Sequence, residues 1–138
     1  MATIRKHVTR SVVTLDQAVP CREAARLMAD KKIGSVGVRV EGRLTGLVTE
    51  RDLVAAVLAR GGDGSLPVRE AARALPRVSP DATEGECATL MRDHGTRHLL
   101  VEEDGEVVGI VSMRDVIAVM LDEKQFVIEQ LQDYITKS

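Results

Sequence analysis

Aromatic side chains are almost absent from this sequence, which has one Phe, one Tyr and no Trp. Proteins that bind single-stranded nucleic acid stack the bases on aromatic rings, so a nucleic-acid partner is not expected. The formal net charge of −2 gives no reason to expect a polyanionic partner either. Since 44% of the residues are hydrophobic and rings are scarce, the core must be built from Val, Leu, Ile, Ala and Met.

Long apolar runs and paired cysteine motifs are also missing. No stretch approaches the ~20 apolar residues of a membrane helix, and residues 1–10 are basic without the apolar segment of a signal peptide. The two cysteines, Cys21 and Cys87, form no C-x-x-C motif. We therefore predict a cytoplasmic protein without membrane contact, in which both cysteines are reduced and buried.

The chain repeats itself with an offset of 63 residues. The segment Gly46–Asp52, GLVTERD, returns as Gly109–Asp115, GIVSMRD. The same offset relates Glu23 to Glu86, Leu27 to Leu90, Met28 to Met91, Gly42 to Gly105 and Leu58 to Leu121. Unrelated segments would match at only about one position in fifteen, so the sequence indicates an internal duplication. Upstream of Glu23, Val13-Thr14 aligns best with Val78-Ser79, which we interpret as two extra residues near Ala18–Pro20.

Both copies predict the element order β-α-β-β-α. The tight turns between the two central strands are expected at Glu41-Gly42 and Asp104-Gly105, because Asp-Gly is a strong hairpin signal. The predicted elements are Val12–Thr14, Arg22–Asp30, Ser35–Val40, Leu44–Val48 and Arg51–Leu58 in the first copy, and Arg77–Ser79, Glu84–Asp93, His98–Glu102, Glu106–Val111 and Arg114–Leu121 in the second. The fold class is α+β, with two repeats related by pseudo-twofold symmetry. Each copy has a three-stranded sheet, and we expect clefts where the copies meet.

The predicted boundaries follow the duplication. They are residues 1–60 for the first repeat, 61–76 for a linker with a short helical turn, 77–122 for the second repeat, and 123–138 for a C-terminal amphipathic helix. The turn is expected at Pro67–Ala72, with a counterpart at Ile4–Val8. Arg69, Glu70 and Arg73 in this linker are interpreted as a solvated surface.

The tail carries an apolar stripe at helical spacing that must be covered, either by its own domain or by a second subunit. Its members are Val127, Ile128, Leu131, Tyr134 and Ile135.

The duplicated segments carry the residues best suited to chemistry. Each has the pattern Gly-h-h-[Thr/Ser]-x-Arg-Asp, where h is apolar, at a predicted strand-to-helix corner. The glycine allows a ligand or another backbone to come close. A hydroxyl and an arginine at a helix N-terminus suit phosphate, and a carboxylate one turn on can accept from ribose hydroxyls. The same hydroxyl and carboxylate are also an N-cap pattern resembling a capping box, and this alternative stays open.

With these features, the chain resembles the CBS domain family in its paired form, the Bateman module. The resemblance covers residues from about Ile4 to Leu121, and it implies that the Thr or Ser contacts phosphate and that the Asp contacts ribose. The implied second site, which we favour, consists of Ser112, Arg114, Asp115, Thr96, Arg97, His98 and Ser79. The implied first site consists of Thr49, Arg51, Asp52, Ile33, Ser35 and Thr14.

The resemblance also implies a function. We expect a regulatory module, not an enzyme, that binds AMP, ADP or ATP, forms a homodimer and passes its state to an unknown regulated protein. No cofactor is expected beyond this nucleotide ligand. The alternatives are a structural homodimerisation module without nucleotide, and a sensor of S-adenosylmethionine or NADH.

The two sites are not expected to be equal. Glu50 stands at the first helix start and repels phosphate, whereas Met113 stands at the second. The second site also has Arg97 and His98 in place of Gly34 and Ser35, so we predict that it binds an anionic nucleotide more tightly. His94 and His98 have the spacing of zinc ligands on a helix, but Gly95 and the following strand argue against a helix, and we predict no metal site.

Overall fold

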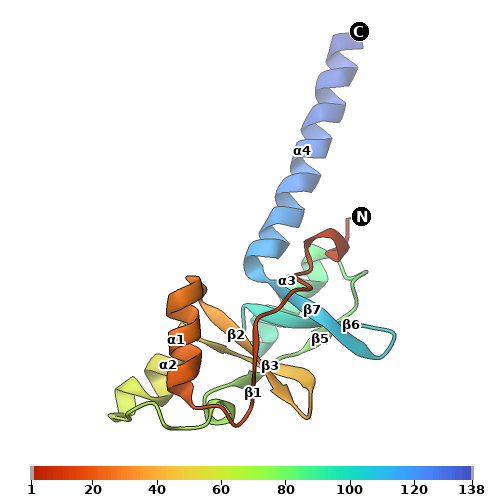
Figure 1. The fold of residues 1–138 in the computed structure, drawn as a ribbon. Helices are drawn as coiled ribbons and strands as arrows, with labels where there is room; N and C mark the ends of the chain where they lie inside the picture. The colour runs from red at the N-terminus through yellow and green to blue at the C-terminus, as the bar shows by residue number, and fades with distance from the viewer. Residues whose placement is uncertain (1, 138) are drawn as a thin grey trace. The chain divides into compact units, whose positions relative to one another are not determined.

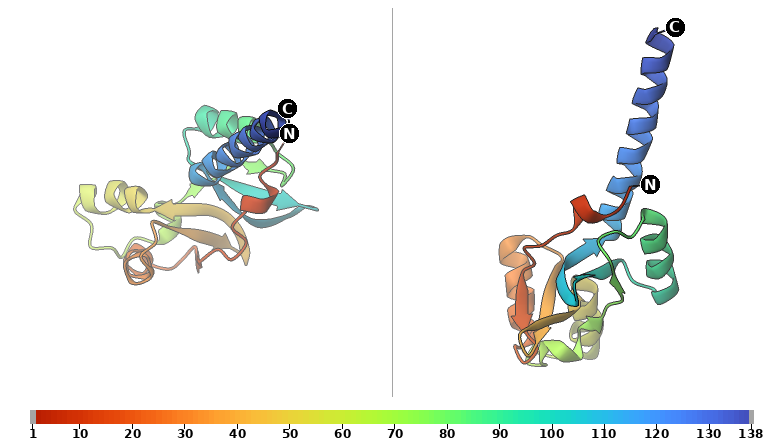
Figure 2. Two further views of the ribbon diagram at one scale, coloured as in Figure 1. Left: turned by 90° about the horizontal axis from the view of Figure 1, so that it is seen from above. Right: turned by 90° about the vertical axis from the view of Figure 1, so that its right-hand side faces the viewer.

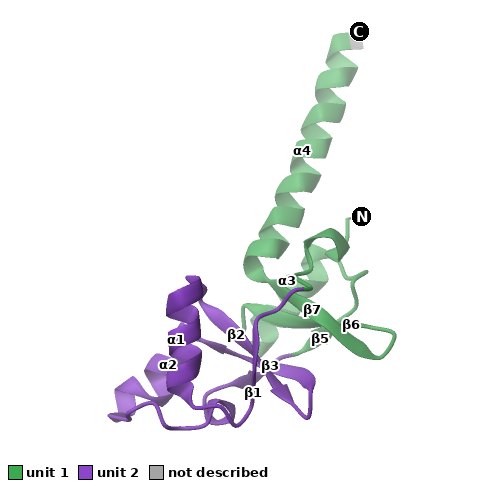
Figure 3. Cartoon of the chain, viewed as in Figure 1, with its two compact units in different colours: residues 1–10, 76–138 green, residues 11–75 purple. Residues whose placement is uncertain are grey.

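The chain folds into two compact units. The computed structural model describes residues 2–137, of which residues 11–75 form unit 2 and residues 2–10 and 76–137 form unit 1 (Figure 3). The segment that precedes the first copy thus belongs to the unit of the second copy, and the segment between the copies belongs to the unit of the first. The predicted boundaries followed chain order and did not anticipate this exchange.

Unit 2 holds the first copy (Figure 1). Its helices are α1 (Cys21–Lys31) and α2 (Glu50–Ala56), with the 3-10 turns η2 (Leu58–Arg60) and η3 (Val68–Glu70). Its strands are β1 (Thr14–Asp16), β2 (Ser35–Val40), β3 (Arg43–Thr49) and β4 (Arg73–Ala74). The sheet order is β1-β2-β3-β4, with β1 parallel to β2 and the other pairs antiparallel. Strand β4 makes this sheet four-stranded, where the sequence predicted three strands.

Unit 1 holds the second copy. It contains η1 (Arg5–His7), β5 (Arg77–Val78), α3 (Glu84–His94), β6 (His98–Glu103), β7 (Glu106–Ser112) and α4 (Met113–Lys137). The sheet order is β5-β6-β7, again with a parallel and an antiparallel pair. The predicted β-α-β-β-α order is confirmed in both units. The predicted C-terminal helix is not a separate element, because α4 continues through it without a break.

The two hairpin turns have the backbone that the sequence predicted. Glu41 and Gly42 have φ values of 52° and 78°, and Asp104 and Gly105 have 53° and 80°. Two consecutive left-handed residues are what a two-residue type I′ turn requires, because this turn matches the twist of the strands that it joins. The turns therefore fix the β2–β3 and β6–β7 pairings.

The strand register corrects the alignment of the two copies upstream of Glu23. Thr14 pairs with Gly37, and Arg77 pairs with Leu100, which is the equivalent of Gly37 at the offset of 63. Thr14 therefore corresponds to Arg77 and not to Ser79. The prediction of two extra residues near Ala18–Pro20 is wrong. It rested on the similar residue types of Val13-Thr14 and Val78-Ser79, but the strand pairing keeps the offset of 63 at Thr14.

Both units are completed by a segment that lies before a copy in sequence. The Ile4 N–H donates to Ala82 O at 3.0 Å in unit 1, and the Val68 N–H donates to Val19 O at 2.7 Å in unit 2. Both Ile4 and Val68 are fully buried. The 3-10 turn η1 begins directly after Ile4 and η3 begins at Val68, so the prediction of helical turns at Ile4–Val8 and Pro67–Ala72 is confirmed.

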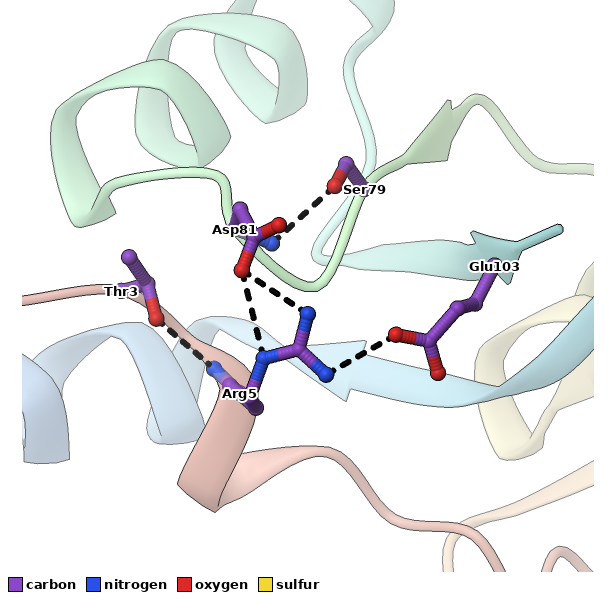
Figure 4. A network of polar contacts seen from close by, with 5 residues as sticks. All are labelled: Thr3, Arg5, Ser79, Asp81 and Glu103. Carbon is purple, nitrogen blue, oxygen red and sulfur yellow. Dashed lines mark hydrogen bonds and ion pairs between the residues drawn. The ribbon is translucent and has the colours of Figure 1, made fainter.

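An arginine network ties the first of these segments to unit 1 (Figure 4). The Arg5 guanidinium lies 2.8 Å from Asp81 Oδ1 and 2.8 Å from Glu103 Oε2. Both carboxylates raise the pKa of Arg5, Asp81 more than Glu103. The Asp81 N–H donates in turn to Ser79 Oγ at 3.1 Å. The network is exposed, so Ile4 and not Arg5 supplies the buried contact of this segment.

Each unit has its own aliphatic core. The core of unit 2 centres on Cys21, Ala24, Met28, Val36, Val38, Val48, Leu53, Val57, Val68 and Ala71. The core of unit 1 centres on Ile4, Ala82, Cys87, Met91, Leu99, Val101, Val111, Val116 and Val119. The second half of α4 adds nothing to this core and extends past the rest of unit 1 (Figure 2). Over the residues that the structure describes, no helix is both long and apolar enough to cross a bilayer.

Candidate functional site

The first corner, defined as Gly46–Asp52, joins β3 to α2 through a complete capping box. The Asp52 N–H donates to Thr49 Oγ1 at 3.1 Å, and the Thr49 N–H donates to Asp52 Oδ2 at 2.8 Å. Two backbone donors that the helix start would leave unpaired are thereby satisfied. The cap that the sequence left as an alternative is present, and it uses only one carboxylate oxygen of Asp52.

The second corner, defined as Gly109–Asp115, repeats this geometry between β7 and α4. The Ser112 N–H donates to Asp115 Oδ2 at 2.7 Å, and the Asp115 N–H donates to Ser112 Oγ at 3.3 Å. The Ser112 hydroxyl also donates to Asp115 Oδ2, at 2.9 Å. Asp115 Oδ1 takes part in none of these bonds, so capping and ligand binding are compatible at this residue.

At the two corners, the first turns of α2 and α4 each keep one backbone N–H group without a hydrogen-bond partner among the described residues. The Glu50 N–H donates to Gly34 O at 3.1 Å, and the Met113 N–H donates to Arg97 O at 2.8 Å. The next donors, the N–H groups of Arg51 and Arg114, have no partner among residues 2–137. A helix N-terminus with an open N–H beside an arginine side chain can accept an anion, although with fewer backbone donors than an uncapped helix offers.

The strand pairing brings some of the predicted site residues to each corner. Ser35 pairs with Thr49 across β2 and β3, and His98 pairs with Ser112 across β6 and β7. The Thr96 hydroxyl accepts from the His98 N–H at 3.3 Å, which holds the start of β6 in place. Residues 33–35 therefore gather with the first corner, and residues 96–98 gather with the second.

Two other predicted site residues have different local roles. The Thr14 hydroxyl accepts from Arg39 Nε at 3.0 Å, while the Ser79 hydroxyl caps the turn at Asp81. Because the strand register makes Thr14 the equivalent of Arg77, Thr14 and Ser79 are not equivalent positions, although both were predicted from the same place in the repeat. Their contact with a ligand stays a prediction.

The corner glycines are explained by backbone contact. A Cβ atom on Gly46 would lie 2.5 Å from Arg73 O, and one on Gly109 would lie 2.4 Å from Thr9 O. These carbonyls belong to the segments that complete each sheet, where Arg73 pairs with Leu47 and Thr9 pairs with Ile110. Of the two reasons that the sequence left open for a glycine here, close approach of a backbone is the one that the structure contains.

Arg73 was missed as a site residue. The sequence placed it on a solvated linker surface, but it lies in β4, and its Nε is 3.1 Å from Asp52 Oδ1. The Asp52 side chain is 11% exposed and that of Arg73 is 49% exposed. The signal that could have found it is the similarity between the segments around Ile4–Arg10 and Val68–Ala74. In that alignment Arg73 is the equivalent of Thr9.

His94 and His98 lie on different elements and do not share the helix face that their spacing would need for zinc. His94 ends α3 and its Nδ1 lies 3.0 Å from Leu90 O, whereas His98 begins β6. The break at Gly95, with a φ of 61°, is the one that the sequence predicted. No group of three His, Cys, Asp or Glu side chains within residues 2–137 is arranged to hold a metal ion.

The fold and its corners define a tandem duplication of one small β-α-β-β-α unit with a capped strand-to-helix corner in each copy. The chain belongs to the CBS domain family, whose sequence profile matches residues 4–59 and 68–122. It is 31% identical over 116 residues to the CBS domain-containing protein YhcV of Bacillus subtilis, and the match covers 83% of both chains.

Solved structures of relatives share the fold. A CBS-domain containing protein of Agrobacterium tumefaciens is 34% identical, with a TM-score of 0.75 over 87% of this chain and 95% of the other. A CBS domain protein of Pyrobaculum aerophilum, solved in complex with AMP, is 28% identical, with a TM-score of 0.73 over 88% and 97% of the two chains. The predicted family and fold class are therefore confirmed.

Proposed function

We propose that this protein is a regulatory module that binds an adenosine nucleotide at its two corners and passes the bound state to a partner protein. The observation that carries the proposal is a constellation present twice: an open backbone N–H, an arginine, a hydroxyl and a carboxylate with one oxygen outside the cap. Phosphate would lie at Arg51 or Arg114, and ribose at Asp52 or Asp115. The AMP complex of the Pyrobaculum relative is consistent with such a ligand.

In this proposal the module is not an enzyme. The chemistry of each corner is that of recognition, since the hydroxyl and one carboxylate oxygen are both engaged in capping the helix. The protein would work in the cytoplasm, where thiols such as Cys21 and Cys87, each buried in the core of its own unit, stay reduced.

A ligand panel tests the proposal. Thermal unfolding is followed with AMP, ADP, ATP, S-adenosylmethionine and NADH, and calorimetric titration then quantifies any hit. A ligand at a hundred times its Kd adds about 2.7 kcal/mol to the free energy of unfolding. We expect AMP, ADP or ATP to raise the midpoint, and Asp52→Ala with Asp115→Ala together to abolish the rise. If no adenosine compound binds, the corners are helix caps only, and the structural dimerisation module becomes the better interpretation.

We also propose that the protein is a homodimer held by α4. Phe126, Val127, Leu131, Tyr134 and Ile135 are each more than half exposed. Val127, Leu131 and Tyr134 follow the 3-4 spacing of a helix seam, and Ile117 and Met120 continue it toward the N-terminus. A helical segment without tertiary contacts is marginal in water, so this half of α4 needs a partner.

The charges on α4 favour a second copy in antiparallel orientation. Lys124 interrupts the apolar seam, and a parallel pair would place two such lysines side by side. An antiparallel pair centred between Val127 and Leu131 instead places the two lysines at opposite ends of the contact. Light scattering after size exclusion should give twice the monomer mass for the wild type and the monomer mass for Leu131→Glu. Gln132→Glu, which adds the same charge on the helix face that points away from the seam, should remain dimeric, and a monomeric wild type would contradict this assembly.

A further inference from the structure

We propose that Arg73 competes with bound ribose for Asp52 and thereby weakens the first corner relative to the second. The inference rests on the proposed nucleotide function and adds a residue that sets the difference between its two sites. It is independent of the contrast between Glu50 and Met113, because it concerns the carboxylate and not the helix start.

Both carboxylate oxygens of Asp52 are engaged in the structure. Oδ2 accepts from the Thr49 N–H at 2.8 Å, and Oδ1 lies 3.1 Å from Arg73 Nε. A ribose diol needs acceptor positions on this carboxylate, and the oxygen outside the cap is the one that Arg73 occupies. Nucleotide binding at the first corner therefore requires the Arg73 side chain to leave Oδ1.

The backbone holds Arg73 beside the corner. Arg73 pairs with Leu47 across β3 and β4, and its carbonyl rests over Gly46, where no side chain intervenes. Only the Arg73 side chain is free to move away from Asp52. Because this side chain is 49% exposed, its guanidinium can be hydrated by water when it does. Partly exposed ion pairs contribute about 1 kcal/mol or less, so we expect a competition of a few-fold and not a closed site.

The second corner lacks this contact. Thr9 takes the place of Arg73, since it pairs with Ile110 and its carbonyl rests over Gly109 in the same way. A threonine cannot form the ion pair, because its side chain is uncharged and too short to reach the carboxylate. Within the described part of the chain, Asp115 Oδ1 has no hydrogen-bond or ion-pair partner.

Calorimetric titration with AMP tests the competition at one corner at a time. In an Asp115→Ala background, which leaves the first corner as the binding site, Arg73→Leu should lower the Kd for AMP about three- to fivefold. Arg73→Lys keeps the charge and should stay near the background value. Arg69→Leu is the matched control, because Arg69 is an exposed arginine of the same segment without an ion pair in the described chain, and it should leave the Kd unchanged.

The reciprocal exchange tests the same idea at the other corner. In an Asp52→Ala background, Thr9→Arg should raise the Kd for AMP at the second corner about three- to fivefold. An unchanged or higher Kd for Arg73→Leu, in a protein that binds AMP, would overturn the role of Arg73 and leave the proposed function intact. A wild-type protein that binds no adenosine nucleotide would overturn both.

Discussion

The carbonyl oxygen of Arg73 rests directly on Gly46, where an added Cβ atom would lie only 2.5 Å from it. Because the obstacle is backbone that is hydrogen-bonded into β4, it cannot move aside as a flexible side chain would. We expect Gly46→Ala to lower the free energy of unfolding by about 1–3 kcal/mol, as for other overpacked positions. Urea unfolding followed by circular dichroism measures this change.

Gly85→Ala is the matched control for this substitution. Gly85 lies in α3 with an ordinary helical backbone, and its added Cβ would meet nothing closer than Thr83 Oγ1 at 3.9 Å. Since alanine is the better helix former, the variant should gain about 0.5 kcal/mol. A Gly46→Ala protein as stable as the wild type would show that β4 does not hold its place against β3.

The capping role and the ligand role of the second corner can be separated by a second cap in the same unit. Ser112 caps α4, and Thr83 caps α3 by accepting from the Glu86 N–H at 3.2 Å. We expect Ser112→Ala and Thr83→Ala each to cost about 1 kcal/mol of stability. Only Ser112→Ala should also weaken AMP binding in calorimetric titration. Equal AMP affinity in the two variants would mean that Ser112 is a cap and nothing more.

The sequence was sufficient for the local elements because each is specified by its own residues. The hairpin turns follow from Glu41-Gly42 and Asp104-Gly105, and β2 was predicted to the residue. The corners were found because the duplication displayed the same pattern twice. In these cases the signal lies within a few consecutive residues, so no knowledge of the tertiary fold is needed.

The sequence was insufficient where a segment finds its partner far along the chain. Strand β4 has two residues and no alternating pattern, and it exists because Arg73 pairs with Leu47. The same holds for Ile4, which is buried against residues of the second copy. The alignment of Thr14 with Ser79 failed for a related reason, since only the register with Gly37 fixes the position of Thr14.

The attachment of the N-terminal segment to unit 1 should depend on Ile4 far more than on Arg5. Ile4 is fully buried in the core, whereas Arg5 is 44% exposed in its network with Asp81 and Glu103. Ile4→Ala should cost about 2–5 kcal/mol, the range for a buried aliphatic side chain. Arg5→Ala should change stability little, because exposed ion pairs contribute little. Hydrogen exchange at the amides of Ile4 and Thr9 reports local release, and faster exchange in Arg5→Ala than in Ile4→Ala would contradict this order.

Cys87 should be unreactive in the folded protein. Its side chain is fully buried, and burial, followed by the charges of Glu86 and Glu84, raises its pKa to about 11 from an ordinary value of 9.0. Since the thiolate is the nucleophile, the folded protein should react with a thiol reagent at pH 8 far more slowly than the protein in urea. A Cys21→Ala background assigns the signal to Cys87 alone.

The same shift has a consequence for stability at high pH. The unfolded chain loses its thiol proton near pH 9, while the folded protein keeps it up to about pH 11, so the unfolded state binds fewer protons in this window. The free energy of unfolding should therefore lose a contribution from Cys87 as pH rises from 9 to 11, and none below pH 9. In the Cys21→Ala background, a further Cys87→Ala change should make the decline between pH 9 and 11 shallower. An unchanged slope would mean that Cys87 titrates alike in both states.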